Sequence, residues 1–534
     1  MENNEESSKE KVNKNKYKVI IIGAGIAGLS AAYHLTKNGI KDFILLEARN
    51  RIGGRIIQIR MGNEKVELGA NWIHGVLGNP IYELAMHYGL VDIMQIPKPH
   101  KLVASTEKGK QVPFQVLREV YEAYLCFLKR CEEYFLSEYL PPDGIDSVGQ
   151  HIRLEVSIYL DKIKDKDERH LRELIFECLL KRETCISGCD DMNEIDLLEL
   201  GTYEELQGGN IVLPEGYSSI LKPFSDDIPS ENILLNHPVN SIKWNSSSNG
   251  NESDDSDKTV VDDSEKLDNS EKNLEFMTNV EVTTSNNKKF YGDHVICTIP
   301  LGVLKHKAKT LFQPQLPDFK LEAIDRLLFG VVDKILLEYD RPFLNPNITE
   351  VLLLWEPDDQ TNCTKQDISK TWYKKIYSFS KISETLLLGW VSGKEAEYME
   401  TLSNDIIINV CTDILRKFLN DPFIPKPKNC VCTSWASQQY TRGSYTAIAV
   451  GASQVDIELL AQPLYADETE TKPLVLFAGE HTHTNFYSTV HGAYLTGRTA
   501  SQAILSSDIP RELTVDCDEE TTDLSSWIQG ICLE

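Results

Sequence analysis

A glycine-rich turn between a β-branched run and an alanine-rich helical pattern constrains this chain more than any other feature. Tyr17–Ile22 has strand character, and Gly23-x-Gly25-x-x-Gly28 leads directly into the helical pattern of Leu29–Lys37. Gly23 permits a tight turn, Gly25 lets backbone approach a pyrophosphate, and Gly28 lets the helix pack closely on the strand. The N-terminus of that helix would offer N–H donors to phosphates. The alternative is a glycine-rich turn that binds nothing.

A second strand strengthens the case for a dinucleotide. Phe43–Leu46 is apolar and ends at Glu47, about twenty residues beyond the glycines, where an acidic side chain accepts a hydrogen bond from a ribose 2′-OH. The order of strand, glycine turn, helix and strand predicts an α/β fold with a Rossmann-like domain. Enzymes that bind NAD share all of these features, so this part of the chain does not identify the nucleotide.

The residues after Glu47 do distinguish between nucleotides. Arg49, Gly53, Gly54 and Arg55 form the pattern ExRxxxGGR, which resembles the second fingerprint of the FAD-dependent amine oxidases. Arginine forks pair with phosphate oxygens, and glycine leaves the backbone bare for a second approach to the pyrophosphate. FAD is therefore the predicted cofactor.

Three further segments carry the same resemblance: 66–75 (VELGANWIHG), 329–339 (FGVVDKILLEY) and 474–503, which contains a buried strand, Gly479-Glu480 and a helix rich in small residues. The matching blocks span about residues 17–505. They are most similar to the animal polyamine oxidases, the group of spermine oxidase and N1-acetylpolyamine oxidase. The resemblance implies a two-domain FAD-dependent amine oxidase fold, with a Rossmann-like FAD-binding domain and an α+β substrate domain.

The resemblance also implies which residues contact FAD. Ser444 stands where monoamine oxidases carry the cysteine that links FAD covalently, so FAD should be bound non-covalently. The helix N-terminal amides at Thr489 and Val490 could serve the pyrimidine oxygens. The full set of expected cofactor contacts is Gly23, Gly25, Ala27, Gly28, Glu47, Arg49, Gly54, Arg55, Gly69, Ala70, Asn71, Trp72, Val239, Gly479, Glu480, Thr489 and Val490.

Two residues are the expected catalytic groups. Strand alternation places Lys334 on one face with Val332, and Asp333 on the other. Lys334 coincides with the family's active-site lysine, which holds a water against flavin N5; the alternative is a lysine pointing outward from an edge strand. His74 in NWIHG is a polyamine-oxidase trait and would position or deprotonate the substrate nitrogen. A buried structural histidine is the alternative there.

The expected substrate is a polyamine that loses hydride from the carbon next to a secondary amine, with O₂ reduced to H₂O₂. Trp72, Tyr445 and Thr489 should line the substrate slot, with Thr489 replacing the second tyrosine of the monoamine-oxidase cage. Glu205, beside Glu204, is the expected partner of a distal ammonium, which favours spermine. N1-acetylated polyamines, monoamines and a lysine demethylase-like activity stay open, although the sequence lacks the long heptad insertion of the demethylases.

A protein of another class also stays open: an inactive flavoprotein that serves as an interaction scaffold, with its acidic insertion as a docking surface. The presence of Lys334 and His74 argues against it.

Domain boundaries follow the motifs and the composition. Helical periodicity extends from Phe114 to about Arg182, broken at Pro141–Gly144, and 233–244 is expected to be a pair of strands. The expected division is a disordered lead at 1–16, an FAD-binding domain at 17–100, 208–304 and 430–507, a substrate-binding domain at 101–207 and 305–429, an acidic disordered insertion at 245–275, and an acidic tail at 508–534.

Composition restricts the partners. The net charge of −26 over 534 residues argues against nucleic acid, although much of it lies in the insertion and the tail. The 12 cysteines include no CxxC, so free thiols and no metal site are expected. No secretory signal, membrane-spanning run, prenylation motif or peroxisomal end is recognisable, which predicts a cytoplasmic protein without a membrane partner, expected to be a monomer.

Overall fold

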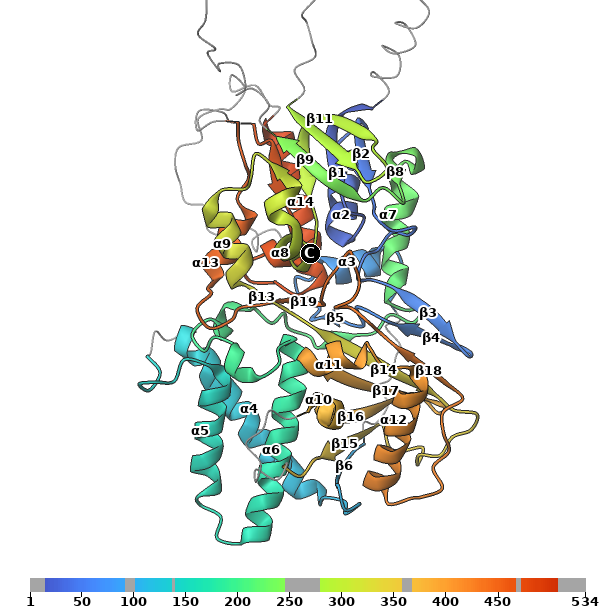
Figure 1. Cartoon of the computed structure of the whole chain (residues 1–534), viewed down its shortest axis with the longest axis vertical. Helices are drawn as coiled ribbons and strands as arrows, with labels where there is room; N and C mark the ends of the chain where they lie inside the picture. Colours follow the sequence, from blue (N-terminus) through green and yellow to red (C-terminus); the bar gives the residue numbers. More distant parts are fainter. Residues whose placement is uncertain are drawn as a thin grey trace, which may run out of the picture.

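The computed structural model describes residues 15–91, 101–136, 140–244, 279–357, 367–466 and 472–507 (Figure 1). Nearly all of the expected lead at 1–16, the whole insertion at 245–275 and the whole tail at 508–534 lie outside the described residues. Lys16, counted with the lead from sequence, is the first residue of strand β1.

The first large sheet has eight strands and surrounds the glycine-rich turn. β1 lies at its centre between parallel β2 and β11, β8 and β20 extend the parallel part, and β10, β9 and β12 complete the other side. The strands are β1 (Lys16–Ile22), β2 (Phe43–Leu46), β8 (Ile233–Leu234), β9 (Val239–Trp244), β10 (Val280–Thr284), β11 (Lys289–Cys297), β12 (Phe312–Gln313) and β20 (Val475–Phe477).

Both faces of this sheet are covered, which explains the continuous apolar run of β1. Ile20 and Ile22 enter one hydrophobic core, whereas Val19 and Ile21 enter the other. A strand buried on both faces needs apolar residues at every position. One face packs on α2 (Ile26–Lys37), α3 (Pro80–His87), α7 (Lys222–Asp227) and α14 (Val490–Ser507), and the other on α8 (Leu301–Leu311), α9 (Asp318–Arg326) and α13 (Gln454–Ala461).

The second large sheet has six strands in the order β18-β14-β17-β16-β15-β6. These are β18 (Asn429–Cys432), β14 (Val332–Glu338), β17 (Leu386–Ser392), β16 (Ser378–Ser383), β15 (Glu350–Leu354) and β6 (Leu102–Thr106). One face packs on α4 (Phe114–Leu136), α5 (Val148–Leu160) and α6 (Lys166–Ser187), and the other on α11 (Gly393–Met399) and α12 (Asn404–Leu419). The helices expected over 114–182 are therefore present, with the break near Pro141–Gly144 between α4 and α5.

Two details differ from the sequence-based expectation. β8 and β9 do not pair with each other: β8 joins β2 and β9 joins β10, because Asn236 in a left-handed conformation and Pro238 redirect the chain between them. The FAD-binding domain was expected to end its middle segment at residue 304, but β12 at 312–313 still pairs with β9 of the first sheet. Its last segment was expected to begin at residue 430, but β18 at 429–432 pairs with β14 of the second sheet.

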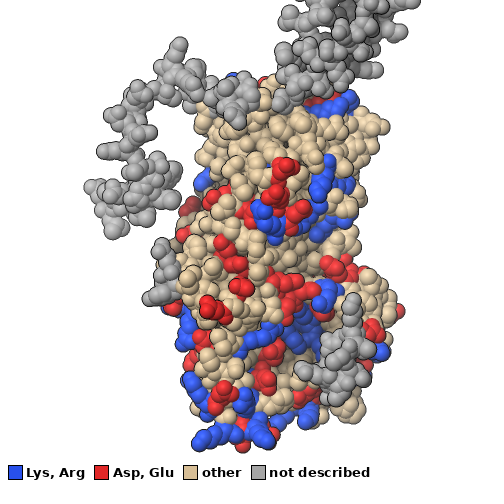
Figure 2. Space-filling model, turned by 60° about the vertical axis from the view of Figure 1, so that its left-hand side comes forward, with Lys and Arg blue, Asp and Glu red and all other residues tan. Residues whose placement is uncertain are grey.

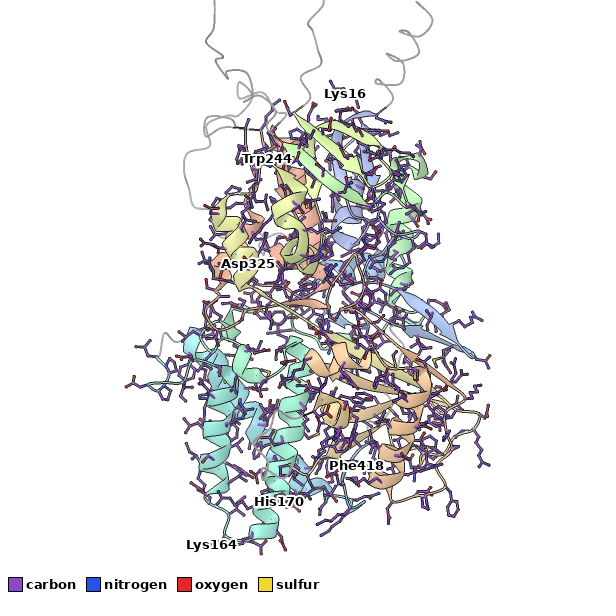
Figure 3. All side chains as sticks on the ribbon, viewed as in Figure 1. Lys16, Lys164, His170, Trp244, Asp325 and Phe418 are labelled. Carbon is purple, nitrogen blue, oxygen red and sulfur yellow. The ribbon has the colours of Figure 1, made fainter. Side chains whose placement is uncertain are left out.

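Three short sheets lie between the two large ones (Figure 1). They pair β3 (Gln58–Met61) with β4 (Glu64–Glu67), β5 (Ile73–His74) with β7 (Asn210–Ile211), and β13 (Leu328–Gly330) with β19 (Tyr445–Ala447). The molecule is elongated, with Lys16 of β1 near one end and Lys164 before α6 near the other (Figure 3). The face drawn in Figure 2 carries acidic and basic side chains intermingled over its lower half.

Helices α2 and α14 approach each other closely at a glycine. A Cβ atom on Gly497 would lie 2.0 Å from the carbonyl oxygen of Ala27, so no larger residue fits without moving a helix. The Ser30 hydroxyl donates to the Tyr494 carbonyl at 2.7 Å across the same contact. The first and last described helices are thereby joined beside the glycine-rich turn.

We expect Gly497→Ala to lower the free energy of unfolding by about 2 kcal/mol, because overpacking a tight contact costs about 1–3 kcal/mol. Urea denaturation followed by far-UV circular dichroism measures the change. Thr499→Ala, on the exposed side of the same helix, is the matched control and should change stability by less than about 0.5 kcal/mol. Equal stability of the two variants would show that the helices can separate freely.

Candidate active site

One cavity of about 1000 Å³ extends from the glycine-rich turn to the helices beside the second sheet. Its volume is at the upper end of small-molecule sites, which occupy roughly 300–1000 Å³. Residues from both large sheets and from two of the short sheets, β5–β7 and β13–β19, line it. Of the site residues predicted from sequence, all line this cavity except Gly28.

The three glycines of the turn meet different surroundings. Gly23 has a φ of +101°, and a Cβ atom on Gly28 would lie 1.9 Å from the Gly23 carbonyl oxygen, so both are required by the backbone. A Cβ atom on Gly25 would meet nothing within 4 Å. Gly25 is also the N-cap of α2, and no side chain caps that helix. The first turn of α2, with Ala27 on the cavity wall, therefore leaves its N–H groups available to an anion.

Glu47 is held rigidly at the end of β2. Its carboxylate accepts hydrogen bonds from the Ala24 N–H and from the Arg49 N–H, both at 2.8 Å, and its side chain is buried. A carboxylate has about four acceptor sites, so two remain for a ligand hydroxyl. Val239 lines the same part of the cavity, across from the turn.

The second glycine motif is connected to the C-terminal part of the chain by Arg55. Its guanidinium forms an ion pair with Glu480 at 2.9 Å and donates to the Ser444 carbonyl at 2.7 Å. Gly54, with φ +58°, lies against Gly25, where an added Cβ would be 3.2 Å from the Gly25 Cα. The two glycine motifs thus form one bare backbone surface.

Glu480 has four hydrogen-bonding partners. Besides Arg55, its oxygens accept from the Thr446 N–H at 3.2 Å, the Thr446 hydroxyl at 3.1 Å and the Ser488 N–H at 3.0 Å. Burial alone would raise the pKa of Glu480, but Arg55 and these hydrogen bonds outweigh it, so the pKa is lowered. Glu480 therefore stays ionised and joins Arg55 to the loop before α14. Gly479, beside it, also lines the cavity.

Helix α14 begins at the cavity wall. The Thr489 hydroxyl accepts from the Gly492 N–H at 2.9 Å and donates to the Phe486 carbonyl at 2.7 Å. Thr489 was expected to contact both substrate and cofactor; the structure uses its hydroxyl to cap the helix. The N–H groups of the first turn, starting at Val490, are the donors that this helix end can offer.

Lys334 lies in the middle of the second sheet, not on an edge strand. Strand β14 pairs with β17 on one side and β18 on the other, and the Lys334 side chain is 3% exposed. Its Nζ donates to the carbonyl oxygens of Glu67 at 2.8 Å and Gly69 at 2.7 Å, and to Asn71 Oδ1 at 3.0 Å. The lysine therefore fixes the loop at 67–71.

The ionisation of Lys334 is balanced near neutrality. Burial lowers the pKa of Lys334 to about 7, and the charge of nearby Glu67 acts weakly in the opposite direction. The ammonium group has three N–H donors, which match its three oxygen acceptors. Near neutral pH the group can both donate and accept a proton, as an acid–base residue requires.

The loop that Lys334 holds lines the cavity with Gly69, Ala70, Asn71 and Trp72. A Cβ atom on Gly69 would lie 1.7 Å from the Arg55 carbonyl oxygen, and the Ala70 N–H donates to that oxygen at 3.3 Å. The loop is thus packed directly on the second glycine motif.

Aromatic rings form one side of the cavity. The rings of Trp72 and Trp390 stack at 6.2 Å, and the His74 ring meets Trp72 edge-on at 6.3 Å. Lys334 Nζ lies 5.0 Å from the Trp390 ring centre. Tyr445 also lines the cavity, and its hydroxyl donates to the Cys185 carbonyl. Flat apolar faces beside a cation-binding group suit an extended apolar chain with positive charges.

Carboxylates gather where the cavity meets the second-domain helices. Glu205 and Glu132 are both exposed and lie close enough that Glu205 contributes to raising the pKa of Glu132, after the larger effect of burial. Glu183, Asp196 and Glu199 line the same region. Burial raises the pKa of Glu183 to about 7, with Arg182 acting in the opposite direction. This part of the cavity is predominantly acidic.

Sequence reasoning missed several residues of the site. Asn210 contacts His74, Trp390 stacks on Trp72, Trp435 lines the cavity beside Gly69, and Glu132 faces Glu205. Trp390 could have been suspected as a tryptophan within an apolar strand. Asn210 and Glu132 have no local signal, because only the tertiary fold brings them to the cavity.

The cavity fits FAD on its own features. An uncapped helix N-terminus, a glycine with open space above it, and a fixed carboxylate at the end of the next strand are the parts that bind a dinucleotide. The second bare backbone surface at Gly53–Gly54 extends them. Among the described residues there is no group of His, Cys, Asp and Glu side chains that could hold a metal ion.

The comparisons with known proteins agree. A family model described as flavin containing amine oxidoreductase matches residues 26–505. The human peroxisomal N(1)-acetyl-spermine/spermidine oxidase is 32% identical over 512 residues, covering 92% of this chain and 96% of the human protein. Polyamine oxidase 1 of Oryza sativa subsp. japonica is 28% identical, covering 92% of this chain and 97% of that protein. A solved putrescine oxidase double mutant has a similar fold, with a TM-score of 0.64 and 16% identity over 92% of this chain and 99% of that one.

A Rossmann-like sheet joined across one cavity to a second sheet defines a two-domain flavoprotein. The chain belongs to the flavin-containing amine oxidoreductase family and is an FAD-dependent amine oxidase. The family, the fold and the cofactor predicted from sequence are confirmed. In the described part of the chain, no helix combines the length and the apolarity that crossing a membrane requires.

We expect FAD to be released by acid. Ser444 lines the cavity, but its hydroxyl donates to the Val332 carbonyl at 3.0 Å and accepts from the Val332 N–H at 2.9 Å, and a hydroxyl is a poor partner for a covalent link to FAD. Acid precipitation should leave all flavin absorbance in the supernatant, for the native enzyme and for Ser444→Ala alike. Flavin that remains in the protein pellet would contradict non-covalent binding.

Proposed function

We propose that the protein is a polyamine oxidase that oxidises the carbon next to a secondary amine, with spermine as the favoured substrate. The observation that carries the proposal is the arrangement of one cavity: a histidine and a buried lysine beside stacked tryptophans, and an acidic region beyond them. The names of the human and rice relatives support the same substrate class.

His74 would take the proton from the substrate nitrogen. A secondary amine arrives protonated, and only the neutral amine can release hydride from its neighbouring carbon. Burial lowers the pKa of His74, with smaller opposing effects from Asn210 and Glu205, so its imidazole is neutral and able to accept a proton near pH 7. Activity should therefore be lost as pH falls through the His74 pKa.

Bound FAD supplies the acceptor for the hydride and passes the electrons to O₂, which becomes H₂O₂. The oxidised substrate is an imine, which water hydrolyses to a shorter polyamine and an aminoaldehyde. Trp72, Trp390 and Tyr445 keep the methylene chain extended and exclude bulk water from the reacting carbon. Lys334 fixes the 67–71 loop, and it would order a water molecule inside the cavity by exchanging one of its three hydrogen bonds to that loop.

The acidic region would hold the distal ammonium of the polyamine. Glu205 was expected to do so from sequence, and Glu132 faces it from α4. Two carboxylates that repel each other are stabilised by a cation between them, so binding a diamine end relieves their repulsion. Spermine brings an ammonium at each end, whereas N1-acetylspermine brings one fewer positive charge.

Replacing Lys334 tests its role. We expect Lys334→Met to retain FAD and to lower turnover by at least about tenfold, roughly 1.4 kcal/mol of barrier, because the cavity loses its buried proton donor. Stopped-flow spectroscopy of flavin bleaching and reoxidation measures both half-reactions.

The matched control is Lys320→Met. Lys320 is also fully buried and donates to the carbonyl oxygens of Leu459 at 2.7 Å and Leu460 at 3.0 Å, but it does not line the cavity. It should lower stability and leave the rate constants within about twofold. Native turnover in Lys334→Met would make Lys334 a structural lysine only.

Substrate choice is tested by kcat/KM, measured from peroxide release with spermine, spermidine, N1-acetylspermine and benzylamine. We expect spermine to be best, and Glu205→Gln and Glu132→Gln each to lower its kcat/KM by about tenfold, since an ammonium–carboxylate contact contributes about 1.5–3 kcal/mol. Benzylamine should be unaffected by either change. A higher kcat/KM for N1-acetylspermine would make it the preferred substrate and leave the assignment as a polyamine oxidase intact. Benzylamine as the best substrate would contradict that assignment.

A further inference from the structure

Asn210 makes the one side-chain hydrogen bond to the His74 ring that the structure records. Strands β5 and β7 are antiparallel, and His74 and Asn210 are direct partners in their register. His74 Nδ1 lies 3.1 Å from Asn210 Oδ1. Both residues line the cavity, and they come from segments 136 residues apart.

The backbone around this pair is fixed on both sides. The buried Asn79 donates from its amide to the His74 carbonyl at 2.8 Å and to the Gly75 carbonyl at 3.1 Å. On the other strand, Gly208 and Gly209 have φ values of +103° and +71°, conformations that bring Asn210 opposite His74. The Gly75 N–H donates to the Gly209 carbonyl at 3.0 Å, which joins the two strands directly beside His74 and Asn210. These contacts fix the two backbones from which the His74 and Asn210 side chains project.

We propose that Asn210 is a positioning residue that sets the tautomer of His74. The structure turns the amide oxygen of Asn210 toward Nδ1, and an amide oxygen only accepts hydrogen bonds, so in this arrangement Nδ1 carries the proton of the neutral ring and donates to Asn210. The lone pair is then on Nε2, the ring atom left free to take the proton of the substrate amine. This inference rests on the proposed role of His74 as proton acceptor.

Other ionisable groups face His74 as well. Glu205, on the segment that leads into β7, raises the pKa of His74, and the charge of His74 in turn lowers the pKa of His491 of α14. Burial lowers the pKa of His491 to about 4, so His491 is neutral near pH 7 and adds no second inflection there to the pH profile of kcat/KM. Lys334 and Glu183 line the same cavity with pKa values of about 7, so the inflection that belongs to His74 is the one that moves when Asn210 is changed.

Asn210→Asp and Asn210→Leu test the proposal in opposite directions. An aspartate stabilises the imidazolium, so the acidic limb of kcat/KM for spermine should move up by about one pH unit, with the plateau retained. Leucine removes the acceptor, so the limb should move down and the plateau should fall about tenfold, because general base catalysis contributes about 10²–10⁴-fold. The value of kcat, measured at saturating spermine, should change less than kcat/KM.

Gln207→Glu is the matched control. It makes the same amide-to-carboxylate change on the same segment, at an exposed side chain that does not line the cavity, and it should leave the limb within about 0.2 units of the native profile. An Asn210→Asp limb that stays with this control, in enzyme with full FAD content, would overturn the proposal.

A second measurement needs no turnover. Nitrogen NMR of ¹⁵N-histidine-labelled holoenzyme, with His74→Gln for assignment, distinguishes protons on Nδ1 and Nε2. The native ring should carry its proton on Nδ1 and lose that preference in Asn210→Leu; a proton on Nε2 overturns the inference. If the native enzyme oxidises no polyamine, the proposed function fails, while this measurement still decides the tautomer.

Discussion

The site depends on the ion pair between Arg55 and Glu480. It joins the second glycine motif to the loop before α14, and the same two side chains reach Ser444, Thr446 and Ser488. Removing one partner of a buried pair costs about 3–5 kcal/mol because the other charge is left uncompensated. Together with the Gly25–Gly54 and Ala27–Gly497 contacts, this ion pair places the two glycine motifs and the start of α14 relative to each other.

A feature of the site could be predicted from sequence when the residues that produce it lie close together in the chain or match a family motif. The roles of Gly23, Gly25 and Gly28 follow from steric requirements within one turn. Strand alternation separated Lys334 from Asp333, and the family resemblance favoured an active-site position for Lys334 over an outward one. The family resemblance brought Arg55, Glu480 and Tyr445 to one site. Asn210 and Glu132 were not predicted as site residues, because only tertiary packing brings them to their neighbours His74 and Glu205.

The errors in the fold have the same origin. A sequence pattern predicts that 233–244 contains extended strands, but it does not say which neighbours they join. Strands that are consecutive in the chain can lie far apart in a sheet: here β8 is one edge strand, whereas β9 lies next to the opposite edge strand, β12. Domain boundaries shifted for a similar reason: β12 and β18 are too short to be assigned to a sheet from their own residues.

The contact between Ala27 and Gly497 bears on how the chain folds. Strand β1 pairs with β11, more than two hundred residues later, and helix α2 packs on the last described helix. Contacts of such long sequence separation slow folding, and transiently exposed apolar surface favours aggregation. During synthesis the glycine-rich turn is made long before α14, so its binding surface is complete only when α14 has left the ribosome. Until then, the apolar faces of β1 and α2 lack part of the surface that they bury in the folded protein.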